Sequence, residues 1–528
     1  MSRSDSRHDG PTMDLDVESD TGNYTQAADS EEAPLLEESP VLPNDLPADI
    51  VPPKSFRFRV LLMCIVFLFI VEVSQFIMEP PLQKIMEDII CRKYYPDHSL
   101  QEPSILDRRC KNDEVQRTLA MVRGWSLSFE MATPILAQFP FGIIADKYGR
   151  RPVLFLSVFG CLLQSCWVML VLYFPDVFSI WAMLPGSLFY LIGGGGPMAS
   201  AMVWTIVADV VPVAERTSVF YQITATVLII NIIVNPISAW LLHFDPWIPM
   251  WLAFGFLIAG TCCTLAIPET LGLRRKADDR RRHGTNAHEP DHEDTEPLKH
   301  HILKQAWFTV KNDMGHVWRF IFASKSIMIL ILAISAHMPI RLAFASILLQ
   351  YISKRFDWDW STATYVLTVG IIATVATLLV VLPLASALVT KHYRYSPMRR
   401  DLFLSRVSIL FLVAGVLLMA FAGVPWLFVT SLVIASMGNA FNTLCRALVN
   451  AVVEPHTVAT LNTTISLAEM IIAVISGPAV GWLMSQGMHL GGAWQGLPFL
   501  VMAFLAVVIS VAMFAFRIPA GVAQAHEG

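Results

Sequence analysis

Twelve separate apolar stretches, each long enough to cross a bilayer, recur along this chain of 528 residues. A hydrocarbon core of about 30 Å requires about 20 apolar residues in a helix. Backbone polar groups inside lipid must find partners within the protein, which restricts spanning segments to helices or closed barrels. The sequence therefore predicts an all-α membrane protein with twelve transmembrane helices, over residues 58–80, 117–141, 153–174, 180–207, 218–242, 248–268, 326–350, 361–389, 402–422, 425–449, 463–487 and 496–517.

The composition supports this class and excludes others. Hydrophobic residues make up 54% of the chain and charged residues only 15%, whereas soluble domains carry about 25% charged residues. The basic residues lie in loops rather than in one patch, so no nucleic-acid partner is expected. The motifs G-x-S-x-G and G-x-x-x-x-G-K-[ST] are missing from the sequence, and its one H-E-x-x-H match, at residues 288–292, lies in the polar segment between the two bundles and not in a predicted helix. We therefore expect no enzyme activity, no metal, no cofactor and no direct use of ATP.

Charge patterning divides the chain into five parts. Residues 1–53 contain thirteen acidic residues against two arginines and are predicted to be a disordered cytoplasmic tail. A six-helix bundle is expected over 54–270, a cytoplasmic linker over 271–325, a second bundle over 326–517 and a short tail over 518–528. Lys and Arg concentrate before helix one and in the gaps after helices two and eight, which places both termini in the cytoplasm.

A short polar gap between the second and third apolar stretches reads GIIADKYGRR, from Gly142 to Arg151. The pattern G-x-x-x-D-[RK]-x-G-R-[RK] resembles the loop between helices two and three of the major facilitator superfamily. This resemblance implies two pseudo-symmetric six-helix bundles and a secondary transporter that moves a small molecule by alternating access. It also implies a conformational lock, formed by Gly142, Asp146, Gly149, Arg150, Arg151 and, at the end of helix four, Asp209.

An internal repeat points to the same architecture. Shifting the chain by 242 residues aligns Gly196 with Gly438 and Pro236 with Pro478, so helices four and five repeat as helices ten and eleven. Parallel repeats of this kind place a substrate site between the halves near the middle of the membrane. The four glycines at 193–196 in helix four are compatible with a packing notch, which is favoured, or with a helix break.

Polar residues inside the spans are functional candidates, because charge in hydrocarbon is costly. The predicted substrate and proton path contains Glu72, Gln75, Arg123, Glu130, His337, Arg341, Asn439, Asn442 and Glu469. Glu72 and Glu130 are the candidate proton sites, with His337 and Arg341 facing them across the cavity. The alternatives are a structural pair between Glu72 and Arg123, or residues at span ends, such as Glu79, Arg123 and Arg446, that reach water.

Two cysteines, Cys91 and Cys110, share the segment between the first two spans on the oxidising side, whereas the other six lie within apolar spans. A disulfide between them is predicted, the alternative being two free thiols. The sequence around this pair resembles loops of fungal facilitator proteins related to the proton-coupled folate and tetracycline-resistance branches. That resemblance names no substrate.

The favoured function is proton-coupled export of a small amphipathic organic compound by a monomer in the lipid bilayer. The alternative is proton-coupled uptake, or vacuolar transport of an organic anion or nutrient. Drug antiporters of the superfamily carry G-P-x-x-G-G in helix five, but here a related Gly477-Pro478 sequence lies in helix eleven, so the direction stays open. The plasma membrane is expected; a dileucine-like motif at Glu31, Leu35 and Leu36 leaves the vacuolar membrane as the alternative.

Overall fold

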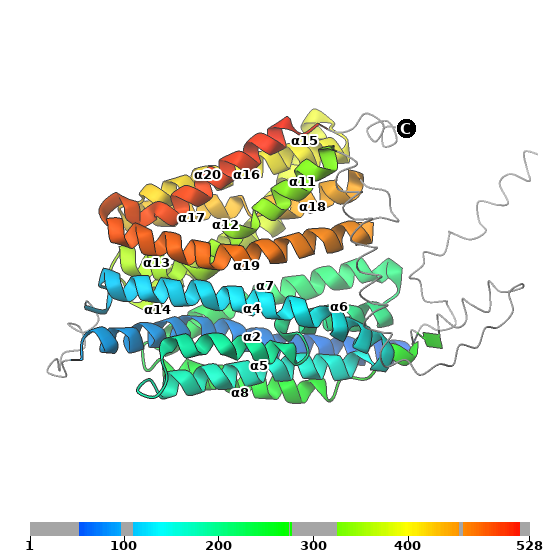
Figure 1. Cartoon of the computed structure of the whole chain (residues 1–528). Helices are drawn as coiled ribbons and strands as arrows, with labels where there is room; N and C mark the ends of the chain where they lie inside the picture. Colours follow the sequence, from blue (N-terminus) through cyan, green and yellow to red (C-terminus); the bar gives the residue numbers. More distant parts are fainter. Residues whose placement is uncertain (1–51, 97–108, 274, 277–324, 453–457, 518–528) are drawn as a thin grey trace, which may run out of the picture.

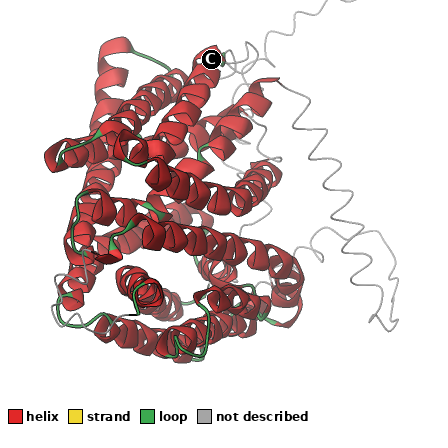
Figure 2. Ribbon diagram, turned by 60° about the vertical axis from the view of Figure 1, so that its left-hand side comes forward, coloured by secondary structure: helices red, strands yellow, loops and turns green. Residues whose placement is uncertain are grey.

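The computed structural model describes residues 52–96, 109–273, 275–276, 325–452 and 458–517. Within these ranges the chain contains only helices and the loops between them (Figure 2). Eleven helices are long and apolar enough to cross a membrane, and a twelfth span results when the bent pair Asp113–Gln138 and Pro140–Tyr148 is counted as one. The predicted all-α membrane fold is therefore confirmed. The sorting motif, most of the N-terminal tail and linker, and the C-terminal tail lie outside the described residues.

Figure 1 shows the helices in two groups, one from each half of the chain. The helices of the first half are α2 (Lys54–Tyr94), α4 (Asp113–Tyr148), α5 (Arg150–Tyr173), the 3₁₀ segment η3 (Ile180–Leu191), α6 (Gly195–Val210), α7 (Val213–Leu242) and α8 (Trp247–Thr264). Those of the second half are α11 (Lys325–Ala336), α12 (Met338–Ser346), α13 (Leu348–Arg355), α14 (Trp360–Ala376), the π-helical η4 (Thr377–Val381), α15 (Leu382–Tyr393), α16 (Pro397–Phe421), α17 (Pro425–Met437), α18 (Ala440–Val452), α19 (Val458–Leu490), the 3₁₀ segment η6 (Gly492–Gly496) and α20 (Leu497–Ala515).

The first helix is longer than the sequence predicted. We expected a loop from Pro81 to Gln116, but α2 continues through two prolines to Tyr94. The continuation is stabilised by burial, because Ile85, Met86 and Ile90 each have less than 5% of their surface exposed and belong to the main apolar core. Cys91 therefore lies on a helix, and the residues around it are held in a fixed orientation.

Helices four and ten are both interrupted, at positions that lie a few residues apart in the alignment of the 242-residue repeat. Helix four breaks at Gly193, Gly194 and Gly195, whose φ angles of 98°, 91° and 61° favour glycine. Helix ten breaks at Gly438, which the 242-residue repeat aligns with Gly196, between α17 and α18. The glycine run therefore forms a helix break and also allows close packing, because a Cβ at Gly193 would lie only 2.3 Å from the backbone of helix α5.

The two halves contact each other along two helix pairs. One pair is α4 with α19, which run side by side in Figure 1, and the other is α7 with α14. In the first half α2 contacts both α4 and α7, and in the second half α12 contacts α19 while α13 contacts α14. The first and seventh helices therefore occupy the space between the two contacting pairs.

Candidate functional site

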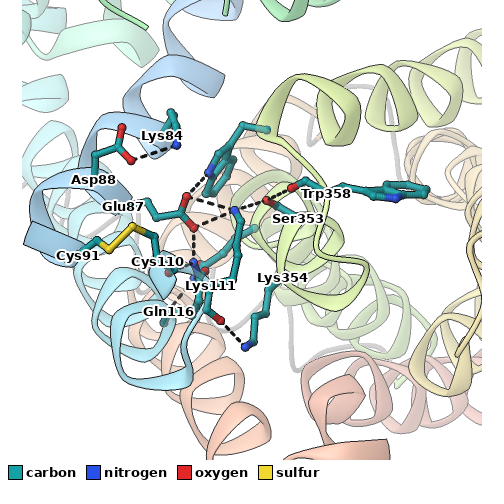
Figure 3. A network of polar contacts seen from close by, with 12 residues as sticks. Lys84, Glu87, Asp88, Cys91, Cys110, Lys111, Gln116, Ser353, Lys354 and Trp358 are labelled. Carbon is teal, nitrogen blue, oxygen red and sulfur yellow. Dashed lines mark hydrogen bonds and ion pairs between the residues drawn. A yellow bond between two sulfur atoms is a disulfide. The ribbon is translucent and has the colours of Figure 1, made fainter. Parts of the chain in front are cut away.

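At the end of the bundle opposite the Gly142–Arg151 motif, the carboxylate of Glu87 lies at the centre of a buried network (Figure 3). Its oxygens accept from Lys111 Nζ at 2.9 and 3.1 Å and from Trp360 Nε1 at 2.6 Å. Gln116 Nε2 donates to the same carboxylate. Since a buried charge is tolerated only when paired and hydrogen-bonded, these partners explain how Glu87 can be 0% exposed.

This Glu87 network joins the two halves of the protein. Lys111 Nζ also donates to Ser353 Oγ at 2.5 Å, so one ammonium group bonds to both halves. Gln350 Nε2 donates to the backbone oxygen of Gln116 at 2.8 Å and to its side-chain oxygen at 3.0 Å. The halves are therefore connected here by buried polar contacts that separation of the two bundles would break.

A disulfide between Cys91 and Cys110 lies directly beside the network, with an S–S distance of 2.04 Å (Figure 3). This is the pair singled out from the sequence. Cys91 is one helical turn beyond Glu87 on α2, and Cys110 immediately precedes Lys111. The crosslink thus holds Lys111 against the helix that carries its carboxylate partner.

The contact between α4 and α19 extends from this end toward the middle of the spans. Gly124 faces Gly477 so closely that a Cβ on either glycine would lie 2.6 Å from the other's backbone oxygen. Farther along, Ser128 Oγ donates to the Val474 oxygen at 2.5 Å. Small residues allow two helices to approach at backbone distance. The Gly477-Pro478 sequence noted in helix eleven therefore serves the contact between the halves.

At the motif end, Arg150 is placed between two carboxylates. It pairs with Asp146 one turn earlier in the chain, and its Nε lies 3.6 Å from Asp209 Oδ2. Thr270 Oγ1 donates to Asp209 at 3.1 Å, which orients the carboxylate. The structure thus brings Asp146, Arg150 and Asp209 together, all within the first half.

Glu269, which the motif analysis did not include, completes this motif cluster. It accepts from the backbone N–H groups of Arg150 at 2.9 Å and Arg151 at 3.0 Å, at the start of α5. A carboxylate at a helix N-terminus satisfies free N–H groups and the helix dipole. Gly149 has a φ of 132° and a Cβ there would lie 2.5 Å from Glu269. Gly142 differs, since a Cβ there meets nothing within 4 Å, so close approach does not explain it.

Within the spans of the first half, Arg123 pairs with Glu79 of α2. It also interacts electrostatically with Glu130, two turns along the same helix. The sequence had offered Glu72 as the partner of Arg123. The partner is Glu79 instead, because Glu79 lies two turns farther along α2, level with Arg123. Glu72 is half-buried and Gln75 exposed.

In the second half, Glu469 does not stand alone as the sequence indicated. Arg446 of α18 donates to it at 2.6 Å, and Arg341 of α12 lies 3.7 Å away. His337 sits at the break between α11 and α12, 1% exposed, and its ring nitrogens have no hydrogen-bond partner among the described residues.

Two asparagines of helix ten were also predicted to line the path. Asn439, at the break in that helix, donates to Thr374 Oγ1 at 3.0 Å. Asn442 is half-buried, and its Oδ1 has no hydrogen-bond partner in the described part of the chain. In the same ranges no group of three or more His, Cys, Asp or Glu residues is placed to hold a metal ion.

A two-bundle helical fold with charged residues between the bundles is an architecture typical of secondary membrane transporters. Residues 120–405, more than half of the chain, match the family model of the Major Facilitator Superfamily. The chain belongs to this superfamily, and it is a multi-pass membrane transporter rather than an enzyme.

Two curated relatives are fungal export proteins. The MFS efflux pump atnC of Emericella nidulans is 28% identical over 502 residues, which cover 92% of this chain and 93% of the relative. The efflux pump ustT of Aspergillus flavus is 27% identical, covering 80% and 81%. Among solved structures, the inward open xylose transporter XylE from E. coli shares the fold with a TM-score of 0.56 at 12% identity, covering 88% of this chain and 97% of that one.

Proposed function

We propose that this protein exports a small amphipathic organic compound by proton-coupled alternating access. The observation that carries this proposal is the closure of the Glu87 end by buried contacts between the halves. Deeper in the spans lie further charged residues, among them Glu469, which is paired with two arginines. Alternating access requires an end that opens and closes around a site in the membrane. The printed names of the two relatives, both efflux pumps, favour export.

Proton coupling is assigned to Glu72 and Glu130. Both lie half-buried in the spans, where a carboxylate without full compensation is costly. The role of Glu130 as a proton site is supported further by its electrostatic interaction with Arg123. Arg123 is hydrogen-bonded to Glu79, so it does not compensate Glu130 alone. Opening of the site to water, or arrival of a charged group near Arg341, would change the field at these carboxylates and release a proton.

The test uses purified protein in sealed vesicles with a pH gradient of either sign. Export by antiport predicts that accumulation is driven by an opposing proton gradient. Glu72→Gln and Glu130→Gln keep shape and remove titration, so exchange of substrate for substrate, measured at saturating substrate, survives while gradient-driven accumulation fails. Glu114→Gln, at an exposed position outside the path, is the control.

The results that would contradict this assignment are distinct. Equal movement without a gradient would remove proton coupling, and accumulation in the opposite direction would indicate uptake. If both glutamine variants still accumulate substrate at the wild-type pH optimum, these carboxylates are structural.

The remaining assignments belong to the same proposal. Both termini are cytoplasmic, as the distribution of Lys and Arg favours, so the Glu87 end faces outside. The protein acts as a monomer in the plasma membrane, and within the superfamily it is related to the proton-coupled folate and tetracycline-resistance branches. Protease protection of tags at each terminus tests the orientation.

A further inference from the structure

Two charge clusters of opposite sign lie in the spans. The first-half triad consists of Glu79, Arg123 and Glu130, in which the guanidinium pairs with Glu79 and interacts electrostatically with Glu130, two turns along the same helix. The second-half triad has one carboxylate between two guanidinium groups and consists of Arg341, Arg446 and Glu469. Each triad leaves one formal charge uncompensated by its own members, negative in the first half and positive in the second.

The two triads lie at similar depth. Helices α4 and α19 run antiparallel, with Gly124 opposite Gly477 and Ser128 bonded to Val474. Glu130 is within one turn beyond Ser128, and Glu469 is between one and two turns beyond Val474 in the matching direction. The carboxylates therefore lie at nearly the same level, past the end of the tight contact, on helices separated by about 8–10 Å, the usual interhelical spacing.

Both triads are turned toward the space between the two contacting helix pairs. One member of each triad, Glu79 on α2 and Arg341 on α12, belongs to a helix that lies between the α4–α19 contact and the α7–α14 contact. Arg341 is 45% exposed at its side chain and Glu79 is 34% exposed. Charges at this depth avoid lipid, so the exposed area marks space that a polar ligand or water occupies.

We propose that the transported compound carries a basic and an acidic group, and that these are recognised by opposite halves. An ammonium group is bound by Glu130 and Glu79, and a carboxylate by Arg341 and Arg446. This assignment rests on the proposed transport function and deepens it by naming the substrate class. A ligand with both charges compensates both triads at once, whereas a ligand with one charge leaves the other triad uncompensated.

The test measures binding to purified protein in nanodiscs with three matched probes. These are the dipeptide Phe-Phe, which is zwitterionic, its C-terminal amide, which is cationic, and its N-acetyl derivative, which is anionic. The zwitterion is expected to bind at least about tenfold more tightly than either derivative, equivalent to about 1.4 kcal/mol.

Two variants assign each charge to its half. Glu130→Gln should remove the preference for the zwitterion over the N-acetyl derivative, while Arg341→Gln should remove its preference over the amide. Lys391→Gln, at an exposed position outside the triads, should leave both preferences unchanged.

Three results would overturn the proposal: no binding of any probe, equal or tighter binding of a singly charged probe, or preferences that neither triad variant alters. Because binding is measured without a proton gradient, these results are independent of the export test. Gradient-driven export with no preference among the probes would refute the substrate class alone.

Discussion

The two ends of the transporter are held by different kinds of contact. At the Glu87 end, a fully buried carboxylate is bonded to residues of both halves, and it has a covalent crosslink beside it. At the motif end, the described contacts of Arg150 and Glu269 stay within the first half, and the Asp146 side chain is 72% exposed. One end therefore joins the bundles in this conformation, whereas the other organises a single bundle.

The difference has an energetic consequence. Removing one member of a buried ion pair costs about 3–5 kcal/mol, because the remaining charge stays buried without compensation. An exposed pair contributes about 0–1 kcal/mol. In this conformation, substitutions at the Glu87 end should change how the halves associate, and substitutions in the motif cluster should change it little.

The largest effect is expected for Glu87→Gln, which leaves Lys111 buried without its counter-charge. The reporter is Ser361→Cys, a buried position in the contact between α7 and α14. Labelling at position 361 by a water-soluble maleimide, read by peptide mass spectrometry, should accelerate at least about tenfold. Glu114→Gln, whose side chain is 59% exposed, is the matched control.

The same experiment has an internal check. Adding Lys111→Met to Glu87→Gln removes both buried charges and should recover most of the protection. Unchanged labelling in the single variant would mean that the Glu87 network does not hold the halves together.

A smaller effect is expected for Cys91→Ser. Crosslinks of this size typically contribute about 2–4 kcal/mol, but Lys111 and Glu87 can still pair without the disulfide. Labelling at position 361 should increase less than with Glu87→Gln, and the gel mobility shift on reduction should disappear. Cys166→Ser removes an exposed free cysteine and serves as the control. The free-thiol count of the unreduced Cys91→Ser protein should rise by one, because Cys110 loses its partner; a count that falls by one would contradict the crosslink.

For Glu269→Gln we expect a loss of about 1 kcal/mol, because the amide is a weaker cap for the free N–H groups of α5. The thermal unfolding midpoint of the purified protein should fall while labelling at position 361 stays at the wild-type rate. Labelling that rises as much as with Glu87→Gln would show that the motif cluster also joins the halves.

The smallest effect on this conformation is expected for Asp146→Asn, because the side chain is mostly in water. The protein should insert normally, while turnover slows more than substrate affinity changes, since the motif acts on the interconversion of states rather than on the site. Asp176→Asn, the same change at an exposed position outside the motif, is the control. Normal transport by correctly inserted Asp146→Asn protein would exclude a role for the motif as a lock.

Several features of this protein follow from local patterns that are visible in the sequence alone. Apolar length predicted the helical membrane fold, and the 242-residue repeat aligned helices four and five with helices ten and eleven. Helices four and ten are both interrupted in the structure. Isolation of Cys91 and Cys110 from the apolar spans indicated their pairing. Each inference depends on residue spacing or on segment composition, which are visible without a fold.

The pairing of side chains that are remote in the sequence depends instead on how the helices pack. Glu87 and Trp360 are 273 residues apart in the sequence, and Arg446 and Glu469 lie on different helices. The extension of α2 beyond Pro81 depends on burial against other helices, which no local pattern encodes. The physical reason is that a buried charge can be partnered by any residue brought near it by packing, so its partner is determined by the fold and not by sequence distance.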